Sequence, residues 1–397
     1  ETVVDDRRCD ENVEPSGNKL FHDSREFVLT HLAVRDNCPG PGHELFDPCM
    51  QQVEVLDPVV DDVHLPASLQ LILDPLLQQL VVDSDTLVSI GSLLRGGVEI
   101  GCRVLYFEKP VLGYWITALS MLLFGENAFA IRLPVALATG ITALLIFWVV
   151  RRYDPGTGSG SGSGGAADGA VLAAVVFLTS PLVFALGSLC LLDGILTLFL
   201  TASMVAFFAA HRAVSQGGRQ GGLALFGALL GCGFLVKGFL VFAVAAASLV
   251  PFLLWEKAWK ELLKVPWVPA LAAMLVALPW GLMIHHRAPE FWAFFFWREH
   301  VVRFLSPVSG QHPEPFWYFL PVLLGGALPW IPLVPAAVGG LKRRGLTPLT
   351  RFALCWLGGP FLFFSACSGK LIPYILPCFP PLAVLIGTGL IHELTAG

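Results

Sequence analysis

Residues 191–210 read LLDGILTLFLTASMVAFFAA, and this stretch decides the class of fold. It is apolar from Gly194 onward and carries one charge, Asp193, close to its start. A helix that crosses the hydrocarbon core of a bilayer needs about 20 predominantly apolar residues. The stretch therefore predicts a membrane-spanning helix with an acidic residue at one membrane boundary.

The whole chain has the composition of a membrane protein. Of its 397 residues 55% are hydrophobic and 14% are charged, and the mean hydropathy is +0.69. Soluble globular domains carry about 25% charged residues. The formal net charge of −5 and the lack of a basic stripe argue against a nucleic-acid partner. The nine cysteines form no C-x-x-C pair, which argues against a zinc ribbon or a redox motif.

Hydropathy divides the chain into two unequal parts. Residues 1–104 are acidic and broken by proline and glycine, so we expect an atypical, weakly ordered N-terminal region of doubtful origin there. Residues 105–397 are predicted to be an all-α integral membrane domain, a polytopic helical bundle. Residues 112–125, LGYWITALSMLLFG, are too short to span and are predicted to be interfacial. About nine spans are expected, at 128–150, 170–187, 194–210, 221–236, 238–255, 266–284, 316–340, 352–367 and 371–391.

Basic residues orient this bundle. They cluster after alternate spans, at 151–152, 211–219, 256–264 and 341–351. Cytoplasmic loops carry an excess of Lys and Arg, so these four connections predict the cytoplasmic face. The opposite face then carries a set of ionisable residues: Glu108, Lys109, Asp193, Lys237, Arg298, Glu299, His300, Arg303 and Lys370.

Ionisable groups near membrane depth face a cavity, pair with one another or mark a substrate path. Several cations and carboxylates at one boundary therefore indicate a site for an anionic lipid headgroup. Each member also has a simpler interpretation. Lys237 could snorkel to the interface, Asp193 could cap the helix that follows, and His300 could be a polar loop residue. His285 and His286 are interpreted as interfacial structure.

Five motifs carry a resemblance to a known family. They are YFEKPVLGYWITALSMLLFGENAFAIRLPVALAT from residue 106, LLDGILTLFLT from 191, GFLVKGF from 233, FFFWREHVVRFL from 294 and SGKLIPYILPCFPPLAVL from 368. Together they resemble the aminoarabinose transferase branch of the GT-C glycosyltransferases, which is similar in architecture to the dolichyl-phosphate-mannose protein mannosyltransferases. The resemblance covers about residues 105–391.

This resemblance implies a polytopic enzyme of the bacterial inner membrane with interfacial helices and its active site at the periplasmic face. The implied donor is undecaprenyl phosphate carrying 4-amino-4-deoxy-L-arabinose, and the implied acceptor is lipid A. Membrane lipid is a further partner. The residues that the resemblance places in the site are Glu108, Lys109, Asp193, Lys237, His300, Lys370 and Tyr374.

The chemistry of transfer suggests roles for these residues. Phosphate is the leaving group, so cations must neutralise its developing charge. We expect Lys109 and Arg303 to hold the donor phosphate, with Lys237, Lys370 and Tyr374 assisting, and Glu108 and Asp193 to be catalytic. Glu108, Asp193 and His300 form a mixed oxygen and nitrogen set that could bind a divalent metal. No obligatory cofactor is expected.

The chain departs from the family pattern before residue 105 and after its last helices. The acidic motif to which the family's base is assigned has no counterpart that we identify, and the family's C-terminal region is expected to be truncated. A fragment without activity is therefore one alternative. A polytopic transporter is another. If the chain is a transferase, two alternatives remain: the sugar could be mannose or another sugar, and the acceptor could be a protein or a glycan.

Overall fold

The computed structural model describes residues 109–154, 164–261, 266–287, 291–293, 295–297 and 314–396. The chain divides into two units, Glu1–His64 and Leu65–Gly397, and every described residue belongs to the second. The predicted N-terminal region, residues 1–104, lies outside the described residues, so its expected weak order stays a prediction.

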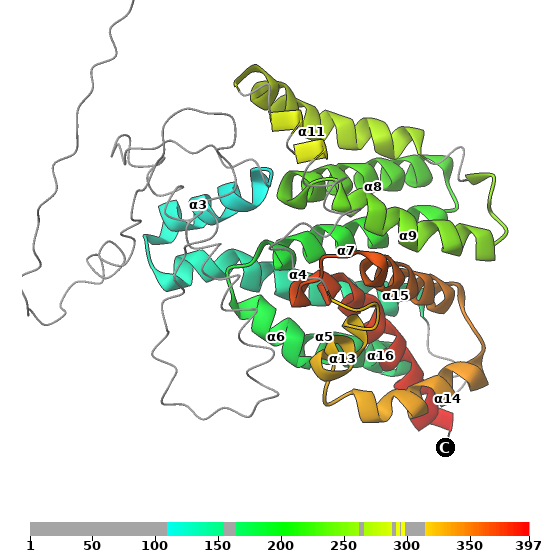
Figure 1. Cartoon of the computed structure of the whole chain (residues 1–397). Helices are drawn as coiled ribbons and strands as arrows, with labels where there is room; N and C mark the ends of the chain where they lie inside the picture. Colours follow the sequence, from blue (N-terminus) through cyan, green and yellow to red (C-terminus); the bar gives the residue numbers. More distant parts are fainter. Residues whose placement is uncertain are drawn as a thin grey trace, which may run out of the picture. The chain divides into compact units, whose positions relative to one another are not determined.

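Helices account for the regular structure of the described residues, which confirms the all-α prediction (Figure 1). Each apolar segment of the sequence forms a helix or a pair of helices. The elements are α3 (Leu112–Phe124), α4 (Ala128–Tyr153), α5 (Gly164–Thr179), α6 (Pro181–Ser188), α7 (Leu192–His211), α8 (Gln216–Lys237), α9 (Leu240–Trp255), α11 (Trp267–Arg287), α13 (Phe319–Gly326), η2 (Ile331–Leu333), α14 (Val334–Arg344), α15 (Pro348–Ala366), η3 (Ile372–Cys378) and α16 (Phe379–Ala396).

Polar side chains begin several of these helices. The Asn127 side chain accepts a hydrogen bond from the Ala130 amide at the start of α4. Ser215 does the same for Gly218 in α8, and Thr347 for Thr350 in α15. Such caps satisfy amide groups that have no partner within the helix. They fix where a span leaves the membrane and its connection begins.

The lengths of the helices bear on the predicted count of about nine spans. Six stretches within the described residues are long and apolar enough to cross a membrane: Ala128–Tyr153, Leu192–His211, Gln216–Lys237, Trp267–His286, Pro348–Ala366 and Ile372–Thr395. Two more candidates are helix pairs bent at a break, which raises the number to eight if each pair is one span. The ninth segment, α9, has 16 residues and is shorter than the usual length. The chain is an integral membrane protein.

Proline accounts for both breaks. The axis turns by 63° between α5 and α6, where Pro181 begins the second helix after Ser180. It turns by 93° between α13 and the segment that begins with η2, where Pro329 and Pro332 occur. Proline lacks the amide hydrogen of a continuing helix and clashes with the preceding turn. Hydropathy averages over such breaks, so the sequence analysis counted each pair as one straight span.

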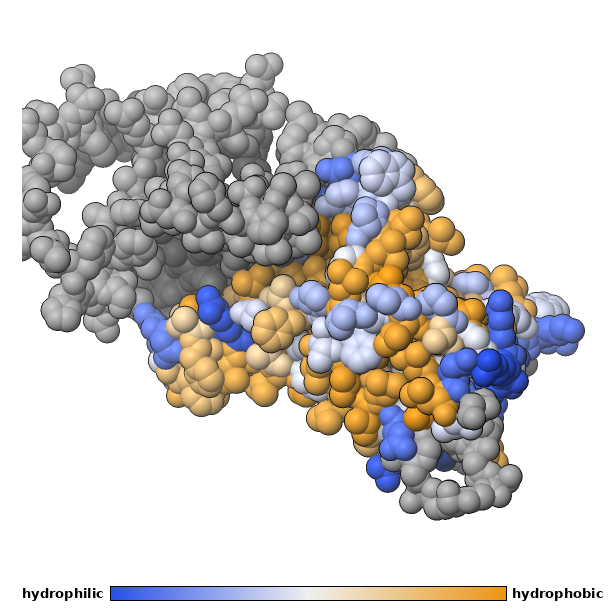
Figure 2. Space-filling model, turned by 90° about the horizontal axis from the view of Figure 1, so that it is seen from below, coloured by the Kyte–Doolittle hydropathy of each residue, from blue (hydrophilic) through white to orange (hydrophobic). Residues whose placement is uncertain are grey.

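The span α7 is one of the two most buried. It packs against α4 and α8, and α8 in turn packs against α11. On the other side α16 packs against α5 and α14, and α15 against α9. Close approach of α15 and α9 depends on Gly359, because a side chain there would collide with the Ala247 carbonyl. Many large apolar side chains are exposed, and Figure 2 shows a broad apolar surface over the helices with hydrophilic residues mostly toward its edges.

Ion pairs join the four basic connections at one end of the bundle. Arg344 at the end of α14 pairs with Asp154 after α4, and Arg351 in α15 pairs with Glu256 after α9. Arg219 in α8 pairs with Glu261 before α11. We call this the inner end and the opposite end, which carries Asp193, the outer end. The predicted gathering of these connections at one face is confirmed.

Candidate functional site

Asp193 and Lys237 are brought together at the outer end by two consecutive spans. Asp193 lies in the first turn of α7, and Lys237 is the last residue of α8. Helix α8 ends there because Gly238 adopts a φ of 78°, a conformation that favours glycine. The two helices pack along their length, so a residue at the start of one meets a residue at the end of the other.

The two side chains form a buried ion pair. The Lys237 Nζ donates to Asp193 Oδ1 over 2.6 Å, and the two side chains are 9% and 5% exposed. Neither simpler interpretation of the sequence holds. Asp193 does not cap α7, whose N-cap is Leu191 and which has no side-chain cap, and Lys237 does not reach out to the interface. A buried pair whose partners depend on each other is costly to break.

Tyr374 covers this pair from a third part of the chain. Its ring lies in η3, and the Lys237 Nζ is 4.8 Å from the ring centroid. A cation over an aromatic face is attracted by the ring's electrons, more strongly where water is excluded. Tyr374 in turn packs against Phe364 of α15 at 6.2 Å between ring centroids. Three elements therefore fix the position of the Lys237 ammonium.

Lys370 lies in the same connection as Tyr374 but binds backbone. Its Nζ donates to the carbonyls of Glu314 and Cys367 over 2.7 and 2.6 Å, and the residue is 3% exposed. Burial raises the pKa of the Cys367 thiol, and the Lys370 charge opposes that shift. An ammonium has three donors, and the described residues accept from two of them. Lys370 joins the segments before α13 and before η3.

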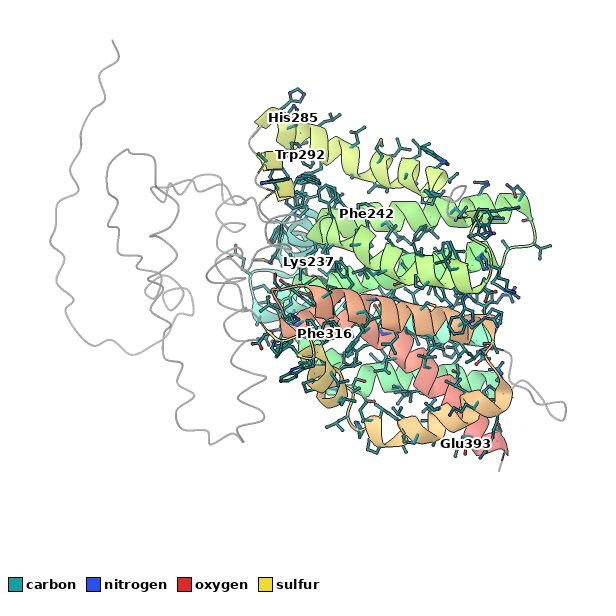
Figure 3. The ribbon with its side chains drawn as sticks, turned by 45° about the vertical axis from the view of Figure 1, so that its right-hand side comes forward. Lys237, Phe242, His285, Trp292, Phe316 and Glu393 are labelled. Carbon is teal, nitrogen blue, oxygen red and sulfur yellow. The ribbon has the colours of Figure 1, made fainter. Side chains whose placement is uncertain are left out.

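Lys109 enters the outer end with α3. Helix α3 packs against α8, and a side chain at Gly113 would collide with Leu192, the neighbour of Asp193. Lys109 is half-buried and precedes this contact by four residues. These contacts place Lys109, Lys237, Lys370 and Tyr374 at one end with Asp193. Figure 3 shows Lys237 at the end of the bundle opposite Glu393. That shared end does not test their predicted roles.

Glu108, His300 and Arg303 lie outside the described residues, and so do Arg298 and Glu299. Within the described ranges no group of three His, Cys, Asp or Glu side chains is arranged to hold a metal ion. Asp193 already shares its charge with Lys237, so a metal there would have to displace an ammonium. The divalent metal predicted at Glu108, Asp193 and His300 stays a prediction.

A long apolar groove was missed by the sequence analysis. It has a volume of about 690 Å³ and runs between α8, α9 and α11. Phe242, His285 and Trp292 line it toward the outer end, and Figure 3 shows them on the same side of the bundle as Lys237. Pro266 and Pro269 line its other end. Residues that face a groove and residues that face lipid are equally apolar, so hydropathy alone could not separate them.

Comparison with known proteins shows the family to which the chain belongs. The sequence pattern of the dolichyl-phosphate-mannose-protein mannosyltransferase family matches residues 93–295. Undecaprenyl phosphate-alpha-4-amino-4-deoxy-L-arabinose arabinosyl transferase of Aeromonas hydrophila is 41% identical over 293 residues, which are 74% of this chain and 52% of the relative. The protein of that name in Edwardsiella ictaluri is 43% identical over 291 residues, 73% of this chain and 50% of the relative.

A solved structure shares the fold. The crystal structure of ArnT from Cupriavidus metallidurans bound to undecaprenyl phosphate is 27% identical, with a TM-score of 0.63 over 72% of this chain and 50% of that one. The chain spans about half the length of the curated relatives that it matches. The matched region contains Lys109, Asp193 and Lys237, and it confirms the resemblance seen in the motifs. The chain belongs to the dolichyl-phosphate-mannose-protein mannosyltransferase family.

Proposed function

We propose that the chain is a glycosyltransferase that moves 4-amino-4-deoxy-L-arabinose from undecaprenyl phosphate to lipid A or a related acceptor. The observation that carries the proposal is the buried Asp193–Lys237 pair beneath Tyr374 at the end of a lipid-exposed bundle. It lies in the region that is similar to transferases named for this donor. Nothing in the described residues favours the alternative of a transporter, because the paired charges lie at the two ends of the spans.

The transfer breaks the bond between the sugar's anomeric carbon and the donor phosphate, and a bond forms from an acceptor oxygen to that carbon. Undecaprenyl phosphate leaves with the electron pair, so negative charge grows on the phosphate. Preorganised cations in a site that excludes water stabilise such charge. We assign Lys109 and Arg303 to the donor phosphate, with Lys237, Tyr374 and the remaining donor of Lys370 assisting.

Asp193 has a defined task in this scheme. Its carboxylate holds the Lys237 ammonium in place beneath the Tyr374 ring. If the acceptor is a phosphate group, it is ionised near neutral pH and needs little help from a base. A hydroxyl acceptor would pass its proton to a carboxylate, for which Glu108 is our candidate.

The apolar groove supplies a place for the polyprenyl chain. Phe239, two residues after Lys237, lines it beside Phe242, and Trp292 stands across from them. A lipid chain lying there would bring its phosphate to the outer end. Apolar contact along the groove would position the donor without contributing to the chemistry.

The periplasmic face of the inner membrane is our assignment for the outer end. The support is the concentration of arginine and lysine at the inner end, which the positive-inside rule places in the cytoplasm. Val214 is fully exposed after α7, and Phe124 is exposed at the end of α3. A membrane-impermeant maleimide should label Phe124→Cys but not Val214→Cys in intact cells with a permeabilised outer membrane. The reverse pattern would overturn the orientation.

The decisive experiment measures sugar transfer by the full chain. Purified protein is reconstituted with undecaprenyl phosphate-linked aminoarabinose and lipid A, and the lipid A products are resolved by mass spectrometry. We expect one added aminoarabinose, and no product with Asp193→Asn. Transfer of a different sugar from its polyprenyl phosphate would correct the substrate alone. Absence of transfer from every polyprenyl-phosphate sugar supplied would overturn the function.

A further inference from the structure

A second pocket lies at the inner end, away from the Asp193–Lys237 pair. Its volume is about 280 Å³. It is formed where the end of α4, the end of α7 and the start of α15 meet. We call it the inner-end pocket, and it is lined by Arg152, Tyr153, Phe208, Arg212, Pro348 and Leu349.

The floor of the inner-end pocket is aromatic. The rings of Tyr153 and Phe208 meet edge to face with centroids 5.2 Å apart, and Phe208 stacks on Phe352 at 4.9 Å. Phe208 and Phe352 are each 1% exposed. Such ring pairs have preferred geometries and add stability beyond the area that they bury. The floor is therefore held by the core and does not depend on a ligand.

Two arginines form the rim. Both Arg152 and Arg212 are exposed. The Arg152 guanidinium lies over the Tyr153 ring at 5.2 Å, and Arg212 is the C-cap residue of α7. A cation at a helix C-terminus is favoured by the helix dipole, which is the simplest explanation for each arginine taken alone. That interaction uses the charge of the guanidinium and none of its N–H donors, and both arginines line the pocket.

The carboxylates near the pocket are already engaged. Four of the five carboxylates that the structure describes at the inner end pair with other cations: Asp154 with Arg344, Glu256 with Arg351, Glu261 with Arg219, and Glu393 with Arg343. The fifth, Asp168, is exposed on α5. No ion pair within the described ranges involves Arg152 or Arg212, so the positive charge of the rim is not neutralised there.

The pocket lies at the level of lipid headgroups. It opens where the spans Ala128–Tyr153 and Pro348–Ala366 meet the inner end. Trp148, one turn before Arg152, is 45% exposed, and its ring contacts Tyr153 at 5.9 Å. Exposed tryptophan at a span end is typical of the membrane–water interface. Basic pockets between spans at this level attract anionic lipids.

We propose that the inner-end pocket binds the phosphate of an anionic phospholipid. Arg152 and Arg212 hold the phosphate from two sides, because a guanidinium presents paired N–H donors that match phosphate oxygens. Tyr153, Phe208 and Leu349 contact the glycerol and the first methylene groups. This site stands apart from sugar transfer: it lies at the other end of the bundle and uses none of the residues assigned to that reaction.

The test is native mass spectrometry of the purified full chain with phosphatidylglycerol or phosphatidylcholine of identical acyl chains. The pocket variant is R152Q/R212Q. The matched control, K257Q/K342Q, removes two exposed inner-end cations that do not line the pocket. We expect wild type and control to prefer phosphatidylglycerol about 10-fold or more, and the pocket variant to lose that preference.

Three further measurements complete the test. Thermal unfolding checks that the pocket variant folds. The variant R152K/R212K keeps both charges but loses the forked donors, so it should lose a smaller part of the preference for phosphatidylglycerol. Inorganic phosphate at millimolar concentration should not displace the lipid. Displacement of the lipid would show that the pocket binds free phosphate, and it would contradict the proposal that the pocket binds a phospholipid. Equal loss in the pocket variant and the control would overturn the pocket itself.

Discussion

The two ends of the bundle use charge differently. At the inner end, ion pairs tie one connection to the next, from Asp154–Arg344 through Glu256–Arg351 to Arg219–Glu261. At the outer end, the described residues form one ion pair, Asp193–Lys237, and it is buried beneath an aromatic ring. Charge at the inner end ties several connections together, and one of those pairs, Asp154–Arg344, is as buried as Asp193–Lys237, whereas the outer-end pair joins two consecutive spans beneath a ring.

The difference teaches that the number of basic residues indicates orientation, whereas a buried cation beneath an aromatic ring indicates a candidate site for an anionic group. The inner end has the larger number of arginines and lysines, most of them exposed and screened by solvent. The outer-end lysines Lys237 and Lys370 are buried with their ammonium groups held in place. A count of basic residues along the sequence predicts the cytoplasmic side, while the buried Lys237 and Lys370 are where we propose that an anionic substrate is stabilised.

The largest effect is expected at Lys237. Lys237→Ala should reduce transfer by about 10³-fold and, because it leaves Asp193 buried without its partner, should lower stability by about 3–5 kcal/mol. The double variant Lys237→Met/Asp193→Leu removes both charges and should recover most of the stability but none of the transfer. Thermal unfolding and the lipid A assay measure the two effects. Transfer near the wild-type rate in either variant would contradict the assignment of the site.

The next largest effect is expected at Lys109, a half-buried cation of the outer end. Lys109→Ala should reduce transfer by about 10²–10³-fold, as expected for loss of one charge-stabilising donor. It should leave unfolding and membrane insertion unchanged, because Lys109 is half-buried and precedes α3. A matched control is Lys257→Ala at the inner end, which should leave transfer intact. Unchanged transfer in Lys109→Ala would remove this residue from the donor site.

Sequence analysis could predict the positions of the helices, because span length and composition are local properties. It could also predict which connections share an end, since the excess of Arg and Lys repeats at alternate loops. It could not predict that Asp193 meets Lys237. They are 44 residues apart, and their contact depends on the register of α7 against α8, about which hydropathy says nothing.

The same limit explains the other differences. A window that averages hydropathy does not detect the 63° turn at Ser180, because Pro181 changes direction without changing polarity. Lys370 was assigned to phosphate from its place in a motif, but its bond to the Glu314 carbonyl depends on a segment that is 56 residues distant in sequence. The catalytic and metal roles suggested for Glu108 and His300 stay predictions, because both lie outside the described residues.

Asp154 tests the inner end. Its side chain is 4% exposed and pairs with Arg344, which also contacts His392. Asp154→Asn should lower stability by about 3 kcal/mol, because the buried arginine loses its compensating charge. Transfer per folded molecule should stay at the wild-type level, since the pair lies at the end opposite Asp193. A loss of turnover in correctly folded protein would show that the two ends are coupled and would break the comparison.

The smallest effect on stability is expected at Arg343, whose ion pair is largely exposed. Arg343 pairs with Glu393 over 3.1 Å, a distance that belongs to a well-formed ion pair, but its side chain is 58% exposed. Solvent screening and the cost of ordering two long side chains leave such pairs worth less than about 1 kcal/mol. Arg343→Gln should therefore shift unfolding by less than about 0.5 kcal/mol, and added salt should remove the difference. A destabilisation as large as that of Asp154→Asn would mean that pairing itself, and not burial, decides what a charge contributes in this bundle.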